Sequence, residues 1–304
     1  MKLPWASLLL VALVFASYVY FAQPEPYAPS AAVGSLGLAS WNLAGVFTHL
    51  FMHQGVHHLL ANILPLAAFA VLLETTMNAG GVLFVFFAAG TAGGLVYVLL
   101  NPGALVIGAS AASSGLMAAA TALRPKQAIL LAVFIAVLAT LFVGPASDYF
   151  TAARKTQVQA EIRVSGEQYA QTNAQLMVAK SSVESTGERI AEFDARGETE
   201  AAARERAILA QQQAALAQAE REAAQASESL ASAQGKAADF ARGEAQENAP
   251  VSSLPHAVGA LVGLLVVLRF RKGDVDENLR SFKAWLARVS ARARRGGRQN
   301  GLTS

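Results

Sequence analysis

The chain has 304 residues, of which 54% are hydrophobic and only 15% are charged. Soluble domains carry more charge and fewer apolar residues, so this composition indicates a protein embedded in a lipid bilayer. The sequence contains no cysteine, which excludes disulfides, zinc–thiolate sites and a cysteine nucleophile. The net charge of +3 is small and no basic patch is interleaved with aromatic residues, so we expect no nucleic-acid partner.

Apolar segments suitable for crossing a membrane recur along the chain, since a spanning helix needs about 20 such residues. They lie at 5–22, 55–73, 79–100, 109–123, 127–144 and 252–270. The first could also be a cleaved signal peptide, but its length favours a retained anchor. Basic residues flank the spans on one side, at Lys2, at Arg124 and Lys126, and at Arg269, Arg271 and Lys272. The positive-inside rule then places both termini in the cytoplasm, and we expect the inner membrane of a bacterium.

The fourth apolar segment, 109–123, is too short to cross the bilayer. At about 1.5 Å per residue it cannot span a hydrocarbon core of about 30 Å. It should therefore begin inside the membrane, and the preceding residues 101–108 must dip into the bilayer. Irregular backbone at that depth is tolerated only inside protein or beside a wet cavity, which predicts a recessed aqueous pocket.

The segment between the fifth and sixth spans is rich in Ala, Gln, Glu, Arg and Ser. Two runs repeat every seven residues, namely Ile162, Tyr169, Leu176, Val183 and Ile190, then Leu209, Leu216, Ala223, Leu230 and Ala237. The break at 194–197 between runs of similar length predicts an antiparallel helical hairpin with a coiled-coil seam on the outer side of the membrane. Self-association or partner binding through this hairpin is an alternative to a purely structural role.

Polar residues within the spans are the candidates for chemistry, because they are costly in a bilayer. Ser110 begins the fourth span and His256 begins the sixth, so a histidine could take the proton of a serine hydroxyl and return it to a leaving amine. His58 and Asn62 are four residues apart on one helix face, where they could donate to one oxygen. The first N–H groups of the fourth span, including that of Ser110, could add a further donor.

The remaining histidines and serines have simpler interpretations. His49, His53 and His57 are spaced for metal binding, but no carboxylate or HExxH motif accompanies them, so hydrogen bonding within the protein is favoured and no metal is expected. Ser113 and Ser114 are alternative nucleophiles by residue type. Small hydroxyl residues inside bundles more often permit close helix packing.

Four motifs in order resemble the rhomboid family of intramembrane serine proteases. They are Phe47-Thr48-His49 with His53, His58 with Asn62, Gly108-Ala109-Ser110, and His256 with Gly259 and Gly263. The resemblance implies a dyad of Ser110 as nucleophile and His256 as general base and acid. It also implies an oxyanion site of His58, Asn62 and the Ser110 N–H, and structural roles for Gly108, Gly259, Gly263 and His53. Two positions depart from the family pattern: Ala111 replaces a glycine, and Asn42 replaces an arginine.

We therefore expect an all-α, polytopic membrane protein with a six-helix rhomboid-like bundle. Residues 1–145 would form spans one to five, 146–250 the extracytoplasmic hairpin, 251–272 the sixth span, and 273–304 a basic amphipathic cytoplasmic tail. The resemblance implies an endopeptidase that cleaves transmembrane segments of single-pass or polytopic membrane proteins within the bilayer, without a cofactor. The alternative is a catalytically inactive rhomboid-like protein that binds or escorts membrane helices.

Overall fold

The computed structural model describes residues 3–22, 28, 30–247 and 252–300 and is almost entirely helical. The helices are α1 (Trp5–Ala22), α2 (Ser30–Leu36), α3 (Gly45–Thr48), α4 (Val56–Glu74), α5 (Ala79–Leu100), α6 (Ser110–Leu123), α7 (Pro125–Leu138), η1 (Ala139–Val143), α8 (Gly144–Ala195), α9 (Thr199–Glu247) and α10 (Leu254–Asn300). Two compact units result, one of residues 1–151 and 242–304 and the other of residues 152–241. The expectation of an all-α membrane protein is confirmed.

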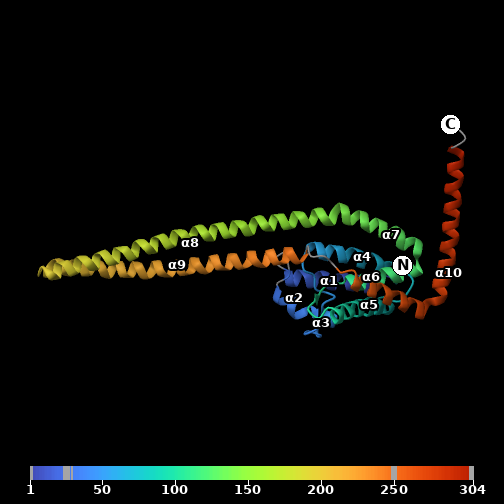
Figure 1. The fold of residues 1–304 in the computed structure, drawn as a ribbon, viewed down its shortest axis with the longest axis horizontal. Coiled ribbons are helices and arrows are strands. Elements are labelled where there is room, and N and C mark those ends of the chain that lie inside the picture. Colours follow the sequence, from blue (N-terminus) through green and yellow to red (C-terminus); the bar gives the residue numbers. More distant parts are fainter. Residues whose placement is uncertain (1–2, 23–27, 29, 248–251, 301–304) are drawn as a thin grey trace. The chain divides into compact units, whose positions relative to one another are not determined.

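Each predicted apolar segment coincides with a helix of the first unit, and these helices run side by side (Figure 1). Four helices of the described chain are long and apolar enough to cross a membrane: α4, α5, the helix that begins at Pro125 and the helix that begins at Leu254. The apolar helices α1 and α6 are shorter. The protein is therefore an integral membrane protein.

The fifth span does not end where its apolar sequence ends. α7 passes through the five-residue π-helix η1 into α8, so one continuous helix leads from the membrane unit into the hairpin. Pro145 does not break this helix: it is the second residue of α8 and directly follows the wider turns of η1. The change of composition near residue 145 therefore does not coincide with a loop.

Helix α6 is the centre of the membrane unit, packed against α4, α5, α7 and α10. Its buried residues are small, and glycines face it from the neighbouring helices. A Cβ atom at Gly259 would fall on the carbonyl of Ala111, and one at Gly263 would fall on the carbonyl of Gly115. The α6 and α10 backbones are thus in direct contact, as small residues permit between membrane helices.

A short antiparallel pair of strands holds the connections at one end of the bundle. β1 (Leu38–Ala39) pairs with β2 (Leu105–Val106), with Leu38 opposite Val106. The Asn42 amide nitrogen donates to the carbonyls of Ser35 (2.9 Å) and Gly37 (3.0 Å), so this residue anchors the connection in place of the arginine of the family pattern. The strands tie the segment before α3 to the segment before α6.

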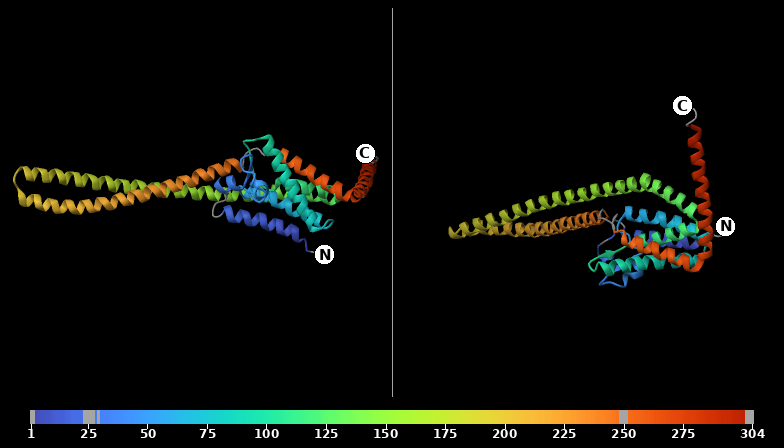
Figure 2. Two further views of the ribbon diagram at one scale, coloured as in Figure 1. Left: turned by 90° about the horizontal axis from the view of Figure 1, so that it is seen from below. Right: turned by 45° about the vertical axis from the view of Figure 1, so that its right-hand side comes forward.

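At the opposite end of the bundle, the α4–α5 connection holds the start of α1 and a kink in α10. Glu74 accepts hydrogen bonds from the backbone N–H groups of Ala6 (3.1 Å) and Ser7 (3.0 Å) and from the Ser7 hydroxyl (2.6 Å). α10 kinks at Arg271, which donates to the Thr76 carbonyl (2.7 Å) and pairs with Asp274. Beyond the kink, α10 runs across the direction of the bundle helices (Figures 1 and 2).

The second unit contains most of α8 and α9, joined by a turn in which Gly197 has φ +76°. The two helices run antiparallel, since Lys236 Nζ lies 3.3 Å from Glu161 Oε2 near one end and Arg189 pairs with Glu205 near the turn. Most of the seven-residue repeat positions lie on the less exposed faces, although Tyr169 is 36% exposed. The turn falls at the predicted break.

The contact of α6 with α10 predicts the effect of one added methyl group. Gly263→Ala places a Cβ on the Gly115 backbone and forces the helices apart, which we expect to cost about 1–3 kcal/mol and to lower the unfolding midpoint in detergent. Gly273→Ala is the matched control on the same helix, because a Cβ there meets nothing within 4 Å. Equal midpoints for the two variants would contradict the backbone contact.

Candidate active site

Ser110 is the first residue of α6 and is half-buried. The turn before it depends on Gly108, whose φ of +100° disfavours any side chain. A Cβ at this position would also lie 2.6 Å from Nε2 of His58. The Gly108 N–H donates to the His49 carbonyl at 2.7 Å, which fixes the turn to the residues after α3. The chain therefore presents Ser110 at a helix start whose first N–H groups have no partner within the helix.

His256 lies in the first turn of α10, directly after Pro255, and is half-buried. Its Nδ1 is 3.1 Å from the carbonyl oxygen of Ser252. In the tautomer in which Nδ1–H donates to this carbonyl, Nε2 carries the free lone pair and is available as a base. The Ser252 hydroxyl in turn accepts from the N–H of Leu254, the first residue of α10, at 3.3 Å. Ser252 therefore binds the start of the helix and also orients the histidine.

The starts of α6 and α10 converge on Gly93 of α5. A Cβ at Gly93 would lie 2.7 Å from Cβ of Ala111 and 2.7 Å from the carbonyl oxygen of Pro255. Ala111 directly follows Ser110, and Pro255 directly precedes His256. The structure therefore brings the chain neighbours of the predicted nucleophile and base to one point, with Gly259 against Ala111 one turn further along α10.

The same contact explains how Ala111 fits where the family pattern has glycine. Ala111 is only 5% exposed, so its methyl group needs space inside the protein. The facing residue on α5 is Gly93, and no side chain competes for that volume. The extra methyl is therefore accommodated on α5 and need not displace Ser110.

His58 and Asn62 both belong to α4, but their surroundings differ. The His58 ring lies against Gly108, two residues before Ser110. Asn62 is buried, and its amide nitrogen donates to the His58 carbonyl at 2.7 Å. An amide has two N–H donors, so this bond leaves one N–H of Asn62 for another acceptor.

His49 and His53 are both buried and pack near these residues. His49 Nδ1 is 2.8 Å from the Gly45 carbonyl, and a Cβ at Gly94 of α5 would lie 2.7 Å from its Nε2. The ring of His53 is 5.1 Å from that of His58, and its Nδ1 is 3.2 Å from the Phe51 carbonyl. The described residues include no cluster of three or more metal-ligating side chains.

Sequence reasoning missed three residues that position the site. Gly93 and Gly94 lie against the site, and their only signal is the run of small residues Ala88-Ala-Gly-Thr-Ala-Gly-Gly94 in α5. Ser252 has the signal of a serine two residues before a helix, which is typical of a helix start. None of the three belongs to a motif that indicates chemistry.

Comparison with known proteins gives a match to a protein family. No curated protein and no solved structure matches the chain. A family model described as Rhomboid domain matches residues 40–162, which include α3 to α7 and hence His58, Asn62 and Ser110, while His256 lies outside the matched range. The resemblance seen in the sequence motifs is confirmed for this part of the chain: residues 40–162 form a Rhomboid domain, and members of the rhomboid family are usually intramembrane serine proteases.

Proposed function

We propose that this protein is an active intramembrane serine endopeptidase with a catalytic dyad of Ser110 and His256. The observation that supports it is the convergence of the starts of α6 and α10 on Gly93. A serine and a histidine at one depth, on helices whose backbones touch, are what acyl transfer requires. A protein that only binds or escorts membrane helices is the alternative, and it would need neither this convergence nor the orienting bond from His256 to Ser252.

The proposed reaction has two stages. Nε2 of His256 takes the hydroxyl proton of Ser110 as Oγ forms a bond to the scissile carbonyl carbon. The tetrahedral intermediate then collapses, the C–N bond breaks, and the proton passes from His256 to the leaving amine. In the second stage His256 takes a proton from water, whose oxygen bonds to the acyl carbon. The C–Oγ bond then breaks, Oγ of Ser110 receives the proton from His256, and the carboxylic acid product leaves. The Ser252 carbonyl holds Nδ1–H throughout, so neither stage uses a metal or cofactor.

The negative charge of the tetrahedral intermediate requires donors aimed at one point. We assign the Ser110 N–H, the His58 ring and the second amide N–H of Asn62 to this role. His58 is the best supported, because its ring lies against the turn that precedes Ser110. The substrates would be single-pass or polytopic membrane proteins that reach the recessed site from the lipid, in keeping with the rhomboid domain.

The distribution of charge supports one orientation in the membrane. Arg124, Lys126, Arg271 and Lys272 all lie at the ends of helices on the side of the α4–α5 connection. We assign this side to the cytoplasm of a bacterial inner membrane, with both termini there and the hairpin outside. The tail of α10 would lie on the inner surface, since Leu279, Leu286 and Val289 on one face are 43–45% exposed.

The first prediction concerns covalent labelling by a fluorophosphonate probe, which reacts only with an activated serine. The purified wild type in detergent should be labelled, and both Ser110→Ala and His256→Ala should lose labelling by more than about 10³-fold, because each removes one half of the dyad. Ser113→Ala is the control, since that hydroxyl is buried without a partner among the described residues. A folded wild type that fails to react would instead favour the non-catalytic binder.

The second prediction tests the oxyanion donors. Removing one such donor typically lowers the rate about 10²–10³-fold, so His58→Ala should reduce cleavage of a transmembrane substrate by this factor with little change in KM. His57→Ala is the matched control, because His57 is the preceding residue and is exposed. Similar rates for His58→Ala and wild type would remove His58 from the mechanism.

The third prediction tests the orientation and the hairpin. The native chain lacks cysteine, so single cysteines introduced at Gly197 and Ser290 can be followed without background. In intact cells, a membrane-impermeant maleimide should label Gly197→Cys and spare Ser290→Cys. The reverse pattern would contradict the assigned orientation.

Oxidative cross-linking of the Gly197→Cys variant into dimers would reveal self-association through the hairpin.

A further inference from the structure

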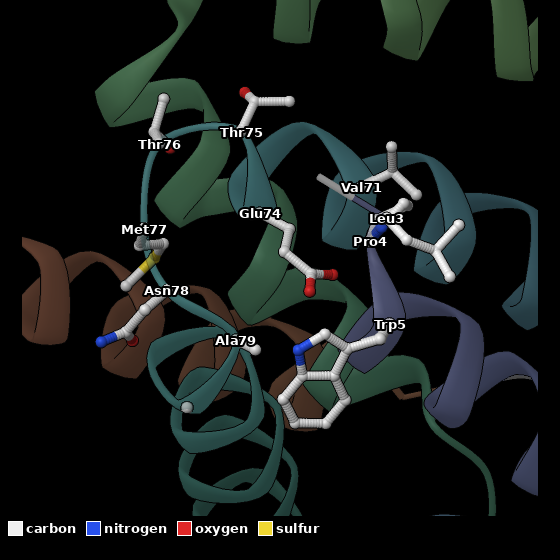
Figure 3. A pocket seen from close by; sticks show the side chains of 11 residues that line it. Leu3, Pro4, Trp5, Val71, Glu74, Thr75, Thr76, Met77, Asn78 and Ala79 are labelled. Atoms are coloured by element: carbon white, nitrogen blue, oxygen red, sulfur yellow. The ribbon is translucent and has the colours of Figure 1, made fainter. Parts of the chain in front are cut away.

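A hollow lies at the end of the membrane unit that carries the α4–α5 connection (Figure 3). It has a volume of about 910 Å³ and is lined by Leu3, Pro4, Trp5, Val71, Glu74, Thr75, Thr76, Met77, Asn78, Ala79 and Gly80. The lining comes from the start of α1, the end of α4 and the α4–α5 connection. Pockets for small molecules have similar volumes, so the hollow can hold a headgroup or a comparable ligand.

Among the lining residues that the structure describes, Glu74 is the only one with a charged side chain, and its carboxylate points into the hollow (Figure 3). The three hydrogen bonds it accepts from Ala6 and Ser7 come from neutral donors. No cation among the described residues forms an ion pair with it. A carboxylate has about four lone-pair sites, so one acceptor position remains for a ligand donor.

The Trp5 indole lies beside the Glu74 carboxylate in the hollow and is 53% exposed. Tryptophan is enriched at the membrane–water interface, and its ring attracts cations. An ammonium group beside both residues would gain a charge-assisted hydrogen bond and an attraction to the ring. The chemistry of the hollow therefore favours a cation, and specifically one that carries N–H donors.

Apolar side chains continue from the hollow along the outside of α1. Leu8, Leu9 and Leu13 follow Trp5 at helical spacing and are 50%, 43% and 44% exposed. Leu3, at the rim, is 71% exposed. Such a stripe accommodates an acyl chain, so an amine attached to a lipid fits this surface better than a soluble amine.

We propose that the hollow between Trp5 and Glu74 binds a phospholipid with a primary ammonium headgroup, of the phosphoethanolamine class. The ammonium donates to the Glu74 carboxylate beside the indole, and the acyl chains lie along α1. A quaternary ammonium headgroup has no N–H to donate, and a glycerol headgroup has no positive charge. The site is at the far end of the bundle from Ser110, so this proposal does not depend on the proposed protease activity.

The test measures lipid retained by the full chain in native mass spectrometry. The purified protein would be titrated with phospholipids of identical acyl chains and ethanolamine, choline or glycerol headgroups. The ethanolamine lipid should bind about tenfold more tightly than the other two, the size expected from one charge-assisted hydrogen bond. Equal affinity for the three headgroups would overturn the proposal.

Two variants separate recognition from folding. Glu74→Gln keeps an acceptor for the start of α1 but removes the charge, and it should abolish the headgroup preference. Trp5→Leu leaves the Glu74 hydrogen bonds in place and should weaken ethanolamine-lipid binding severalfold, whereas Trp41→Leu, a similarly exposed tryptophan elsewhere, should not. An unchanged preference in both variants, at unchanged helicity, contradicts the site. Competition by soluble phosphoethanolamine at the concentration of the lipid would overturn the assignment to a lipid.

Discussion

The contact between the backbones of α6 and α10 is the constraint on which the candidate site depends. Ala111 and Gly115 present their carbonyls to Gly259 and Gly263, and no side chain separates the two helices. In a bilayer, apolar side chains gain little by leaving lipid for protein, so close packing of small residues has to hold the helices together. Ser110 directly precedes Ala111, and His256 lies about one turn before Gly259. The packing that stabilises the bundle therefore also sets the distance between Ser110 and His256.

The candidate site also requires an anchored turn before α6, since that helix begins inside the bundle. The Gly108 N–H bonds to the His49 carbonyl, and the His58 ring lies where a side chain at Gly108 would be. β1 and β2 hold the two connections together, and Asn42 binds the carbonyls before β1. Irregular backbone within a membrane must be satisfied by protein, and each of these contacts supplies a partner from a different element.

Periodicity and length were sufficient to predict the apolar helices of the membrane unit. The bounds of α1, α4, α5 and α6 differ from the predicted spans by one residue at most. Their ends could be predicted because each apolar segment is bounded by polar residues that are visible in the sequence itself. The continuous passage from α7 to α8 was not predicted, since a five-residue π-helix leaves no compositional signal. The strands β1 and β2, two residues each, were also missed, because only their pairing defines them.

The motifs indicated which side chains are candidates for chemistry but not what surrounds them. Ala111 was a departure whose effect depends on Gly93, a residue 18 positions earlier on another helix, and no single-sequence pattern links the two. In the same way, the sequence assigned no partner to orient His256. A long-range contact of this kind becomes evident only when the helices are placed.

The partner of His256 is a carbonyl and not a carboxylate, and this difference has a chemical consequence. In a Ser-His-Asp triad the acid fixes the tautomer of the histidine and stabilises the imidazolium that forms during reaction. The Ser252 carbonyl can perform the first task, because Nδ1–H has one acceptor within 3.1 Å. As a neutral dipole it contributes less to the second task. The proposed dyad therefore depends more heavily on the donors that stabilise the oxyanion, so the placement of His58 beside the Ser110 turn matters as much to the mechanism as the base itself.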